Sequence, residues 1–180
     1  MESLRGHLLI ANGNLFDPNF RHTVVLVAEH NADGALGVVL NRPLDVPVSD
    51  AAPLLAPLVA AREVLYQGGP VQPYSPVVAA ELVRPEVADV PVFGGVGLFL
   101  GRVPAEFTGD VIRARVFAGY SGWDAGQLER EMDEDSWIID PAREEDIFTN
   151  APDLLWSRVL VRKGPEYRRL SRVPFDPSMN

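Results

Sequence analysis

The segment that decides the fold is Gly119-Tyr120-Ser121-Gly122-Trp123-Asp124-Ala125-Gly126-Gln127-Leu128-Glu129. It follows the apolar run 111–118, which predicts a strand. It also contains an Asp with a Gln three residues later, which is the pattern of a helix capping box. Two glycines separate these signals, and glycine lets the backbone turn sharply. The sequence therefore predicts a strand-to-helix corner, with a helix that begins at Asp124.

Two aromatic side chains lie at this predicted corner. Tyr120 and Trp123 carry large apolar surfaces, and such rings usually anchor a core. We expect both to be structural and to hold the strand against the helix, whose inner face presents Leu128 and Met132 at i,i+4 spacing. The alternative is an exposed aromatic platform for a ligand.

Short apolar runs alternate with turn signals along the rest of the chain. The expected strands are 7–11, 23–29, 35–40, 64–66, 76–83, 96–100, 111–118 and 137–139, and the expected helices are 49–62, 150–163 and the one beginning at residue 124. Arg113 and Arg115 alternate with apolar residues, which predicts one solvated face for that strand. Neighbouring strands joined by short loops pair as antiparallel hairpins. The order predicts an α+β fold: a single domain over 1–180 with a mixed, mostly antiparallel sheet, flanking helices and a tail at 165–180.

Composition limits the possible functions. The chain has 180 residues, a net charge of −9 and no cysteine, which excludes disulfides, thiolate catalysis and zinc bound by cysteine. His7, His22 and His30 lack the spacing of a helical metal site, so we expect neither a metal nor a cofactor. The first residues do not resemble a signal peptide, and no run approaches the ~20 apolar residues of a membrane helix. We expect a cytoplasmic protein with no membrane contact.

Charge is distributed unevenly. Residues 129–146 carry nine acidic residues and two arginines, whereas residues 158–172 are rich in arginine. We interpret them as two solvated faces that face each other. The alternative is a basic segment that binds a polyanion. The acidic overall balance opposes nucleic acid binding, because phosphate contacts need clustered Lys and Arg.

Two motifs suggest chemistry but do not match the patterns that it requires. A nucleophile elbow needs a glycine two residues after its serine, and Trp123 stands there after Ser121. The run Gly68-Gly69-Pro70 lacks the lysine and the spacing of a phosphate-binding loop. Both motifs are better interpreted as turns where backbone segments approach closely, with Ser121 bonded to nearby backbone.

Polar residues at two strand ends predict a candidate pocket. Glu29 and His30 end one strand, and Asn41 and Arg42 follow its partner strand. Neighbours on a strand point to opposite faces, so Glu29 and His30 can share a site only if a bulge intervenes. The structural alternative is a strand-end pair without a ligand. The functional interpretation is a pocket at the sheet edge that all four residues line.

Four ordered motifs extend the analysis beyond single residues. They are Arg21-His22-Thr23-Val24-Val25, Gly34-Ala35-Leu36-Gly37-Val38-Val39-Leu40-Asn41-Arg42-Pro43, Tyr66-Gln67-Gly68-Gly69-Pro70-Val71, and Gly119-Tyr120-Ser121-Gly122-Trp123 followed by Gly126-Gln127-Leu128-Glu129. With these motifs the chain resembles the YqgE/AlgH family of bacterial proteins from residue 4 to about residue 163. The resemblance implies an α+β fold whose mixed sheet curls towards a barrel. It implies no established activity, although the AlgH name implies transcriptional regulation.

Most of the family-motif residues are expected to be structural, namely Gly68, Gly69, Pro70, Gly119, Tyr120, Gly122, Trp123, Gly126, Gln127 and Glu129. The chain departs from the family's usual pattern at Asn12-Gly13, at Ser121 and at 72–75. The departure at Ser121, where the family often has alanine, further opposes a nucleophile there.

Three functional hypotheses follow. The first is a non-enzymatic binding or regulatory protein with an unidentified protein or small-molecule partner. The second is a hydrolase for a small substrate, with histidine as general base and arginine as anion clamp at the Glu29, His30, Asn41, Arg42 site. The third is direct DNA binding through 158–172. The absence of a catalytic constellation favours the first, and the sequence sets no oligomeric state.

Overall fold

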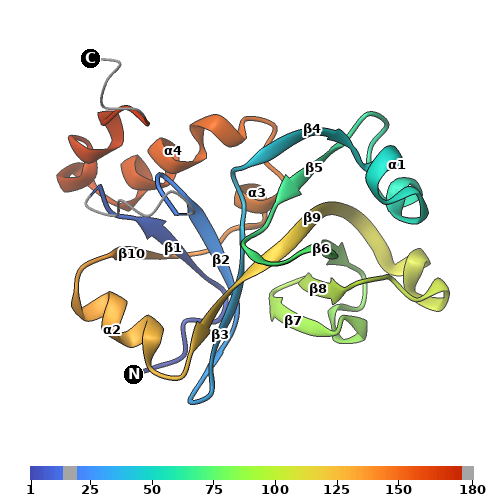
Figure 1. Ribbon diagram of the computed structural model, residues 1–180, viewed down its shortest axis with the longest axis horizontal. Coiled ribbons are helices and arrows are strands. Elements are labelled where there is room, and N and C mark those ends of the chain that lie inside the picture. Colours follow the sequence, from blue (N-terminus) through green and yellow to red (C-terminus); the bar gives the residue numbers. More distant parts are fainter. Residues whose placement is uncertain (14–19, 176–180) are drawn as a thin grey trace.

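The computed structural model describes residues 1–13 and 20–175, and ten of its strands form one curved sheet with helices packed around it (Figure 1). The strands are β1 (His7–Ala11), β2 (Val24–Asn31), β3 (Gly34–Val39), β4 (Pro43–Pro47), β5 (Val64–Gln67), β6 (Val71–Leu82), β7 (Val90–Phe93), β8 (Val96–Leu100), β9 (Val111–Asp124) and β10 (Trp137–Pro141). The α-helices are α1 (Val48–Ala51), α2 (Gln127–Asp133), α3 (Glu144–Ile147) and α4 (Leu155–Lys163). Short 3-10 helices occupy Pro53–Leu58, Pro85–Val87, Ala105–Asp110, Pro152–Leu154, Pro165–Tyr167 and Leu170–Arg172.

The sheet is mixed and mostly antiparallel, as the sequence predicts. Its main order is β10-β1-β2-β3-β9-β6-β8-β7, and the pairs along this path are antiparallel. Strand β5 runs parallel to β9 and pairs with β4. Edge strand β7 packs against β2, so the sheet curls, but no ladder in the described chain joins its two edges and the barrel stays open.

Strand β2 lies at the centre of the hydrophobic core, as its apolar sequence predicts. Val24 and Leu26 point to the inside of the curl, where α4 also packs. Val25 and Val27 point to the other face, where α2 covers Trp123 and Trp137. Both faces of β2 are therefore buried, and the helices α2 and α4 lie on opposite sides of this part of the sheet.

The predicted strand-to-helix corner at residues 119–122 is wrong. Strand β9 continues through it to Asp124, and its last part pairs with β3. Gly119, at a φ of 71°, lies where β9 leaves its continuous ladder with β6 and moves towards β3. The positive φ of this glycine therefore lets a single strand change its pairing partner from β6 to β3.

The predicted cap at Asp124 is also wrong. Helix α2 begins at Gln127 after Gly126, whose φ is 75°, and no side chain caps it. One half of the expected box does form, because the Asp124 backbone N–H donates to the Gln127 Oε1 at 3.0 Å. The Asp124 side chain is exposed at the end of the strand.

The two glycine motifs meet at a crossing of backbone segments. The Gly68 N–H donates to the Ala118 carbonyl at 2.9 Å, and a Cβ added at Gly119 would lie 2.7 Å from the Gly69 carbonyl. Ser121 is buried here, and its hydroxyl donates to the Gly68 carbonyl at 3.2 Å. Glycine is therefore needed at positions 68, 69 and 119, because a Cβ there would collide with the neighbouring backbone.

Prolines account for two further differences from the predicted elements. The helix expected over 49–62 is only α1 followed by the 3-10 helix Pro53–Leu58, because Pro53 and Pro57 each lack a backbone N–H donor. No strand is expected between residues 40 and 64, yet β4 begins at Pro43, and it is an edge strand, which tolerates proline.

Arg115 is the exception to the solvated face expected of β9. It is buried, and its guanidinium donates to the carbonyls of Ile147 and Thr149 at 3.0 and 2.8 Å and lies 3.4 Å from a Glu63 carboxylate oxygen. The end of α3 and the residues that follow it cover Arg115, and local alternation along β9 does not predict this contact.

Candidate functional site

The structure does not bring the four predicted pocket residues together. Glu29 and His30 lie near the end of β2, on opposite faces, with Glu29 exposed and His30 buried. A bulge does interrupt the β2 ladder between Val27 and Glu29, but the two side chains still diverge. Asn41 and Arg42 lie at the other end of β2, because Asn41 Oδ1 accepts the Val24 N–H at 3.0 Å. The hydrolase site that required all four is therefore not assembled.

His30 forms a structural pair with a residue of another family motif. Its Nε2 lies 2.9 Å from Glu129 Oε1, and its Nδ1 accepts the Leu4 N–H at 3.0 Å. Because Nδ1 accepts, the ring proton lies on Nε2 and is donated to the carboxylate. The N–H of its own backbone and then His30 lower the pKa of Glu129. Both ring nitrogens are engaged, so His30 holds the N-terminal segment against α2 and has no nitrogen left to act as a base.

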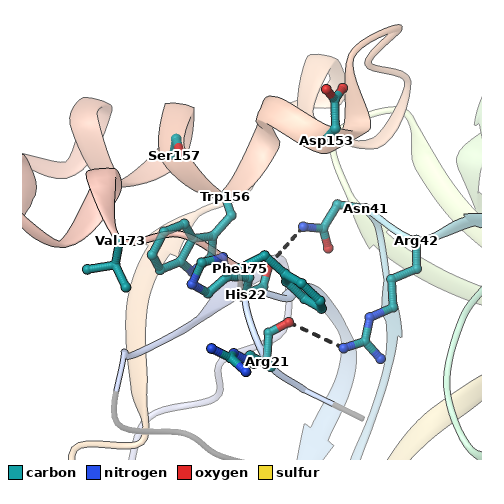
Figure 2. Close-up of a pocket in the computed structure, with 9 residues that line it drawn as sticks. All are labelled: Arg21, His22, Asn41, Arg42, Asp153, Trp156, Ser157, Val173 and Phe175. Carbon is teal, nitrogen blue, oxygen red and sulfur yellow. Dashed lines mark hydrogen bonds between the residues drawn. The ribbon is translucent and has the colours of Figure 1, made fainter. Parts of the chain in front are cut away.

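Asn41 and Arg42 line a cavity of about 320 Å³ (Figure 2). The cavity lies where the segment before β2, the end of β3, the first turn of α4 and the C-terminal segment meet. Its lining residues are Arg21, His22, Asn41, Arg42, Asp153, Trp156, Ser157, Val173 and Phe175.

One wall of the pocket is aromatic and held in place. The rings of His22 and Trp156 stack with centroids 3.8 Å apart and planes 8° apart. Asn41 Nδ2 donates to the His22 carbonyl at 2.9 Å, and Trp156 Nε1 donates to the Ala11 carbonyl at 2.9 Å. His22 has a φ of 53°, which is uncommon for a residue with a side chain and often marks a functional site.

The pocket also has a positive field. Arg21 lines the cavity, and Arg42 Nη2 donates to its backbone carbonyl at 3.3 Å, so the Arg42 side chain lies against the Arg21 backbone. Burial, and then the charge of Arg21, lower the pKa of His22, so its imidazole is neutral at pH 7. The carboxylate of the lining is that of Asp153, which is exposed and points away from the other side chains in Figure 2.

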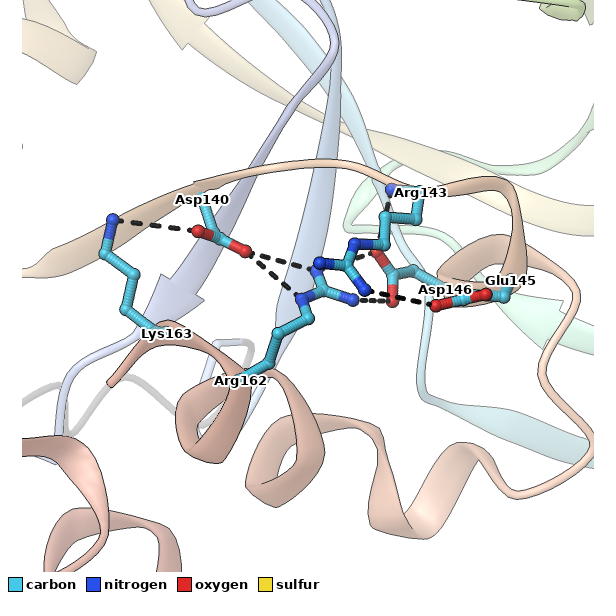
Figure 3. Close-up of polar contacts among 6 residues, drawn as sticks. All are labelled: Asp140, Arg143, Glu145, Asp146, Arg162 and Lys163. Carbon is cyan, nitrogen blue, oxygen red and sulfur yellow. Dashed lines mark hydrogen bonds and ion pairs between the residues drawn. The ribbon is translucent and has the colours of Figure 1, made fainter. Parts of the chain in front are cut away.

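The basic C-terminal segment faces the acidic one, as the sequence interpretation expects, but the contact between them is largely buried and not solvated (Figure 3). Arg162 donates to both Asp146 oxygens at 2.8 and 3.0 Å and lies 3.2 Å from Asp140 Oδ2. Lys163 Nζ lies 3.7 Å from Asp140 Oδ1. These internal pairs occupy cations that a polyanion site over 158–172 would need.

Within residues 1–13 and 20–175, no three His, Asp or Glu side chains form a group that could hold a metal ion. In the same part of the chain, no helix has the length and apolar character to cross a membrane.

Sequence reasoning missed most of this pocket. Arg21 and His22 belong to the first family motif, but no charge or spacing pattern linked them to Asn41 and Arg42. Trp156 is not among the predicted site residues, and its ring is buried but also lines the cavity. Phe175 lies in the predicted tail and carried no signal at all. Backbone strain at His22 is visible only in three dimensions.

Comparisons with known proteins agree with the fold. A family model described as AlgH-like matches residues 8–168. A protein of Streptomyces avermitilis named UPF0301 protein is 40% identical over 189 residues, which cover 100% of this chain and 97% of the relative. A UPF0301 protein of Chlorobaculum tepidum is also 40% identical, over 97% of this chain and 95% of its own.

Two solved structures share the architecture. The crystal structure of a Corynebacterium diphtheriae protein superposes with a TM-score of 0.84 at 27% identity and covers 95% of this chain and 93% of its own. The solution structure of the AlgH protein from Pseudomonas aeruginosa superposes with a TM-score of 0.73 at 29% identity, over 94% of each chain. By its sequence and its fold, this chain belongs to the AlgH-like family of UPF0301 proteins.

Proposed function

We propose that this protein is a non-enzymatic binding protein of the bacterial cytoplasm, whose ligand is a small anion held beside Arg21 and Arg42. The observation that carries the proposal is the environment of Arg21. In the described ranges no carboxylate forms an ion pair with it, although it lines a cavity of about 320 Å³. A guanidinium offers several donors in a planar fork and matches a carboxylate or phosphate group.

Two features of the pocket support an anion over a cation. The field of Arg21 already opposes protonation of His22, so a second positive charge there is disfavoured. An anion would lower the energy of the Arg21 side chain, which lies in a half-buried site where charges are screened less than at the open surface. The local positive field attracts an anion to the pocket, even though the net charge of the whole molecule is −9.

The geometry gives less support to the other two hypotheses. The predicted hydrolase takes its base from Glu29 or His30, but both lie at the far end of β2 from Arg42, and His30 Nε2 already contacts Glu129. Direct DNA binding needs free clustered cations, and Arg162 and Lys163 are paired inside the molecule. A regulatory role remains part of the proposal only as a response to ligand binding.

A thermal-shift titration with inorganic phosphate and with acetate tests the anion site. Chloride at equal ionic strength is the reference, because it removes general screening. We expect one of the two anions to raise Tm in wild type, since a ligand of the native state stabilises it. Arg21→Ala should abolish the shift, and Arg102→Ala, an exposed arginine outside the pocket, should keep it.

An NMR titration of the His22 ring gives a second measurement. Bound anion offsets the charge of Arg21, so the pKa of His22 should rise towards its ordinary value of 6.5 in the presence of the ligand. The proposal fails if neither anion shifts Tm, or if the shift and the titration are the same in Arg21→Ala as in wild type.

A further inference from the structure

The pocket contains a side chain that belongs to a different part of the chain. The ring of Phe175, from the C-terminal segment, packs edge-on against the His22 ring with centroids 5.6 Å apart and planes 80° apart. The Arg21 guanidinium carbon lies 5.5 Å from the centre of the same ring. Figure 2 shows this ring in the middle of the pocket, with the Trp156–His22 stack on one side and Arg42 on the other.

These contacts describe a slot for an aromatic ring. One side is the aromatic wall, and edge-on packing at such distances is favourable between aromatic rings. A second side is the Arg21 guanidinium, which lies near the face of the ring, and aromatic faces attract cations. The slot is preformed, because hydrogen bonds from Asn41 and Trp156 fix its wall.

Phe175 occupies this slot loosely. It remains 59% exposed, so most of its surface gains nothing from the contact. Val173, two residues earlier, also lines the cavity and is 41% exposed. A segment held by so little buried surface can leave at small cost, unlike the buried rings of Trp156 or Phe117.

We propose that the ligand of this pocket is an aromatic carboxylate, and that Phe175 occupies the place of its ring in the free protein. This inference rests on the proposed anion site and adds the chemical class of its ligand. The ring of the ligand lies against His22, and its carboxylate reaches the donors of Arg21. Occupation by Phe175 lowers the apparent affinity, because only the open fraction of the protein can bind.

Titration calorimetry with benzoate and with cyclohexanecarboxylate tests the inference. The two anions have the same charge and similar size, and only benzoate has an aromatic ring. Wild type should prefer benzoate. Phe175→Ala should bind benzoate about 2- to 10-fold more tightly than wild type, which is the range expected when one aromatic contact no longer competes. Val161→Ala, at an exposed apolar residue of α4 outside the pocket lining, is the control and should leave the affinity for benzoate unchanged.

The outcomes separate this inference from the anion site itself. If both anions bind equally and Arg21→Ala abolishes both, the anion site stands and the aromatic inference is overturned. If Phe175→Ala leaves benzoate affinity unchanged or weakens it, Phe175 is not a substitute for the ligand. If neither anion binds any variant, the aromatic inference is overturned, whereas the anion site is decided by the titration with phosphate and acetate. Phe175 is largely exposed, so its variant should fold, and an unchanged Tm without ligand verifies this.

Discussion

Trp123 is the single residue whose role is best defined by its contacts. Its ring is 4% exposed, packs edge-on against Trp137 at 6.3 Å, and donates its indole N–H to Glu131 Oε2 at 2.9 Å. Trp137 donates to the same oxygen at 2.8 Å, so one carboxylate of α2 fixes both rings. The ring is therefore a core anchor between β9, β10 and α2, and no face of it is free to serve as a platform.

We expect Trp123→Ala to lower the free energy of unfolding by roughly 3–5 kcal/mol, because it leaves a large cavity in a packed core. Trp123→Phe keeps most of the packing and loses the hydrogen bond to a charged group, so it should cost only about 1–3 kcal/mol. Asp124→Ala is the neighbouring control and should stay within about 0.5 kcal/mol, since its exposed side chain caps nothing. Urea denaturation measures all three, and an unchanged midpoint in Trp123→Ala would contradict the structural role.

The pKa of His22 predicts how the stability of the fold depends on pH. Its pKa in the folded protein is lowered by burial and by Arg21, so between that pKa and the unfolded value of 6.5 the unfolded chain binds more protons. Stability should therefore fall as pH drops below 6.5 and should be independent of this residue well above it. Glu129, whose pKa is also lowered, responds only below its ordinary value of 4.5.

The variant for this test is His22→Asn, because asparagine tolerates a positive φ better than most residues. Denaturant midpoints measured between about pH 5 and pH 7.5 should change less in the variant than in wild type. Only the slope matters, since the variant also loses the stack on Trp156. Equal slopes would show that His22 titrates in the folded protein as it does in the unfolded chain.

Among the elements, β9 depends most on its glycines. It pairs with β6 and β5 up to Ala118, with β6 again at Tyr120, and with β3 from Ser121 onward, so one strand links three neighbours. Periodicity predicted its first part well, since apolar alternation is local. It could not predict that β9 continues beyond Ala118, because the same glycines are expected at a sharp corner and at a change of pairing partner. The same limit explains β4, where a proline permitted an edge strand.

Gly119→Ala tests the crossing directly. Its φ of 71° disfavours alanine, and the new Cβ would lie 2.7 Å from the Gly69 carbonyl and 2.8 Å from the Val71 carbonyl. The left-handed conformation alone costs about 1–2 kcal/mol, so with the close contacts we expect a loss of more than about 2 kcal/mol. Gly109→Ala is the matched control, because a Cβ there meets nothing within 4 Å. Equal unfolding midpoints for the two variants would contradict the proposed crossing.

At the scale of the whole molecule, the sequence predicted the fold class and the family but not the site. The motifs identify the family because they contain the glycines that close backbone approaches require, such as that of Gly68 to Gly119. The predicted pocket does not form, because Glu29 and His30 lie at one end of β2 and Asn41 lies at the other, so the length of the strand separates them. The pocket that exists joins residues 21–22, 41–42, 153–157 and 173–175, and only tertiary structure brings these ranges together.

The C-terminal helix is joined to the sheet by charge as well as by apolar packing, and this leads to a prediction for the whole fold. Asp146 is 2% exposed and accepts both the Arg162 guanidinium and the Arg143 backbone N–H, the latter at 2.8 Å (Figure 3). Removing Arg162 leaves this buried carboxylate without its cation, which typically costs about 3–5 kcal/mol. Arg162→Ala should therefore destabilise the protein strongly.

Arg158→Ala, on the same helix but exposed, is the control and should stay within about 0.5 kcal/mol. The difference between the two variants should persist in high salt, because buried pairs are screened much less than exposed ones. Urea denaturation at low and high salt measures it. If Arg162→Ala matches Arg158→Ala, the network of Figure 3 is a solvated surface pair and α4 is held by its apolar face alone.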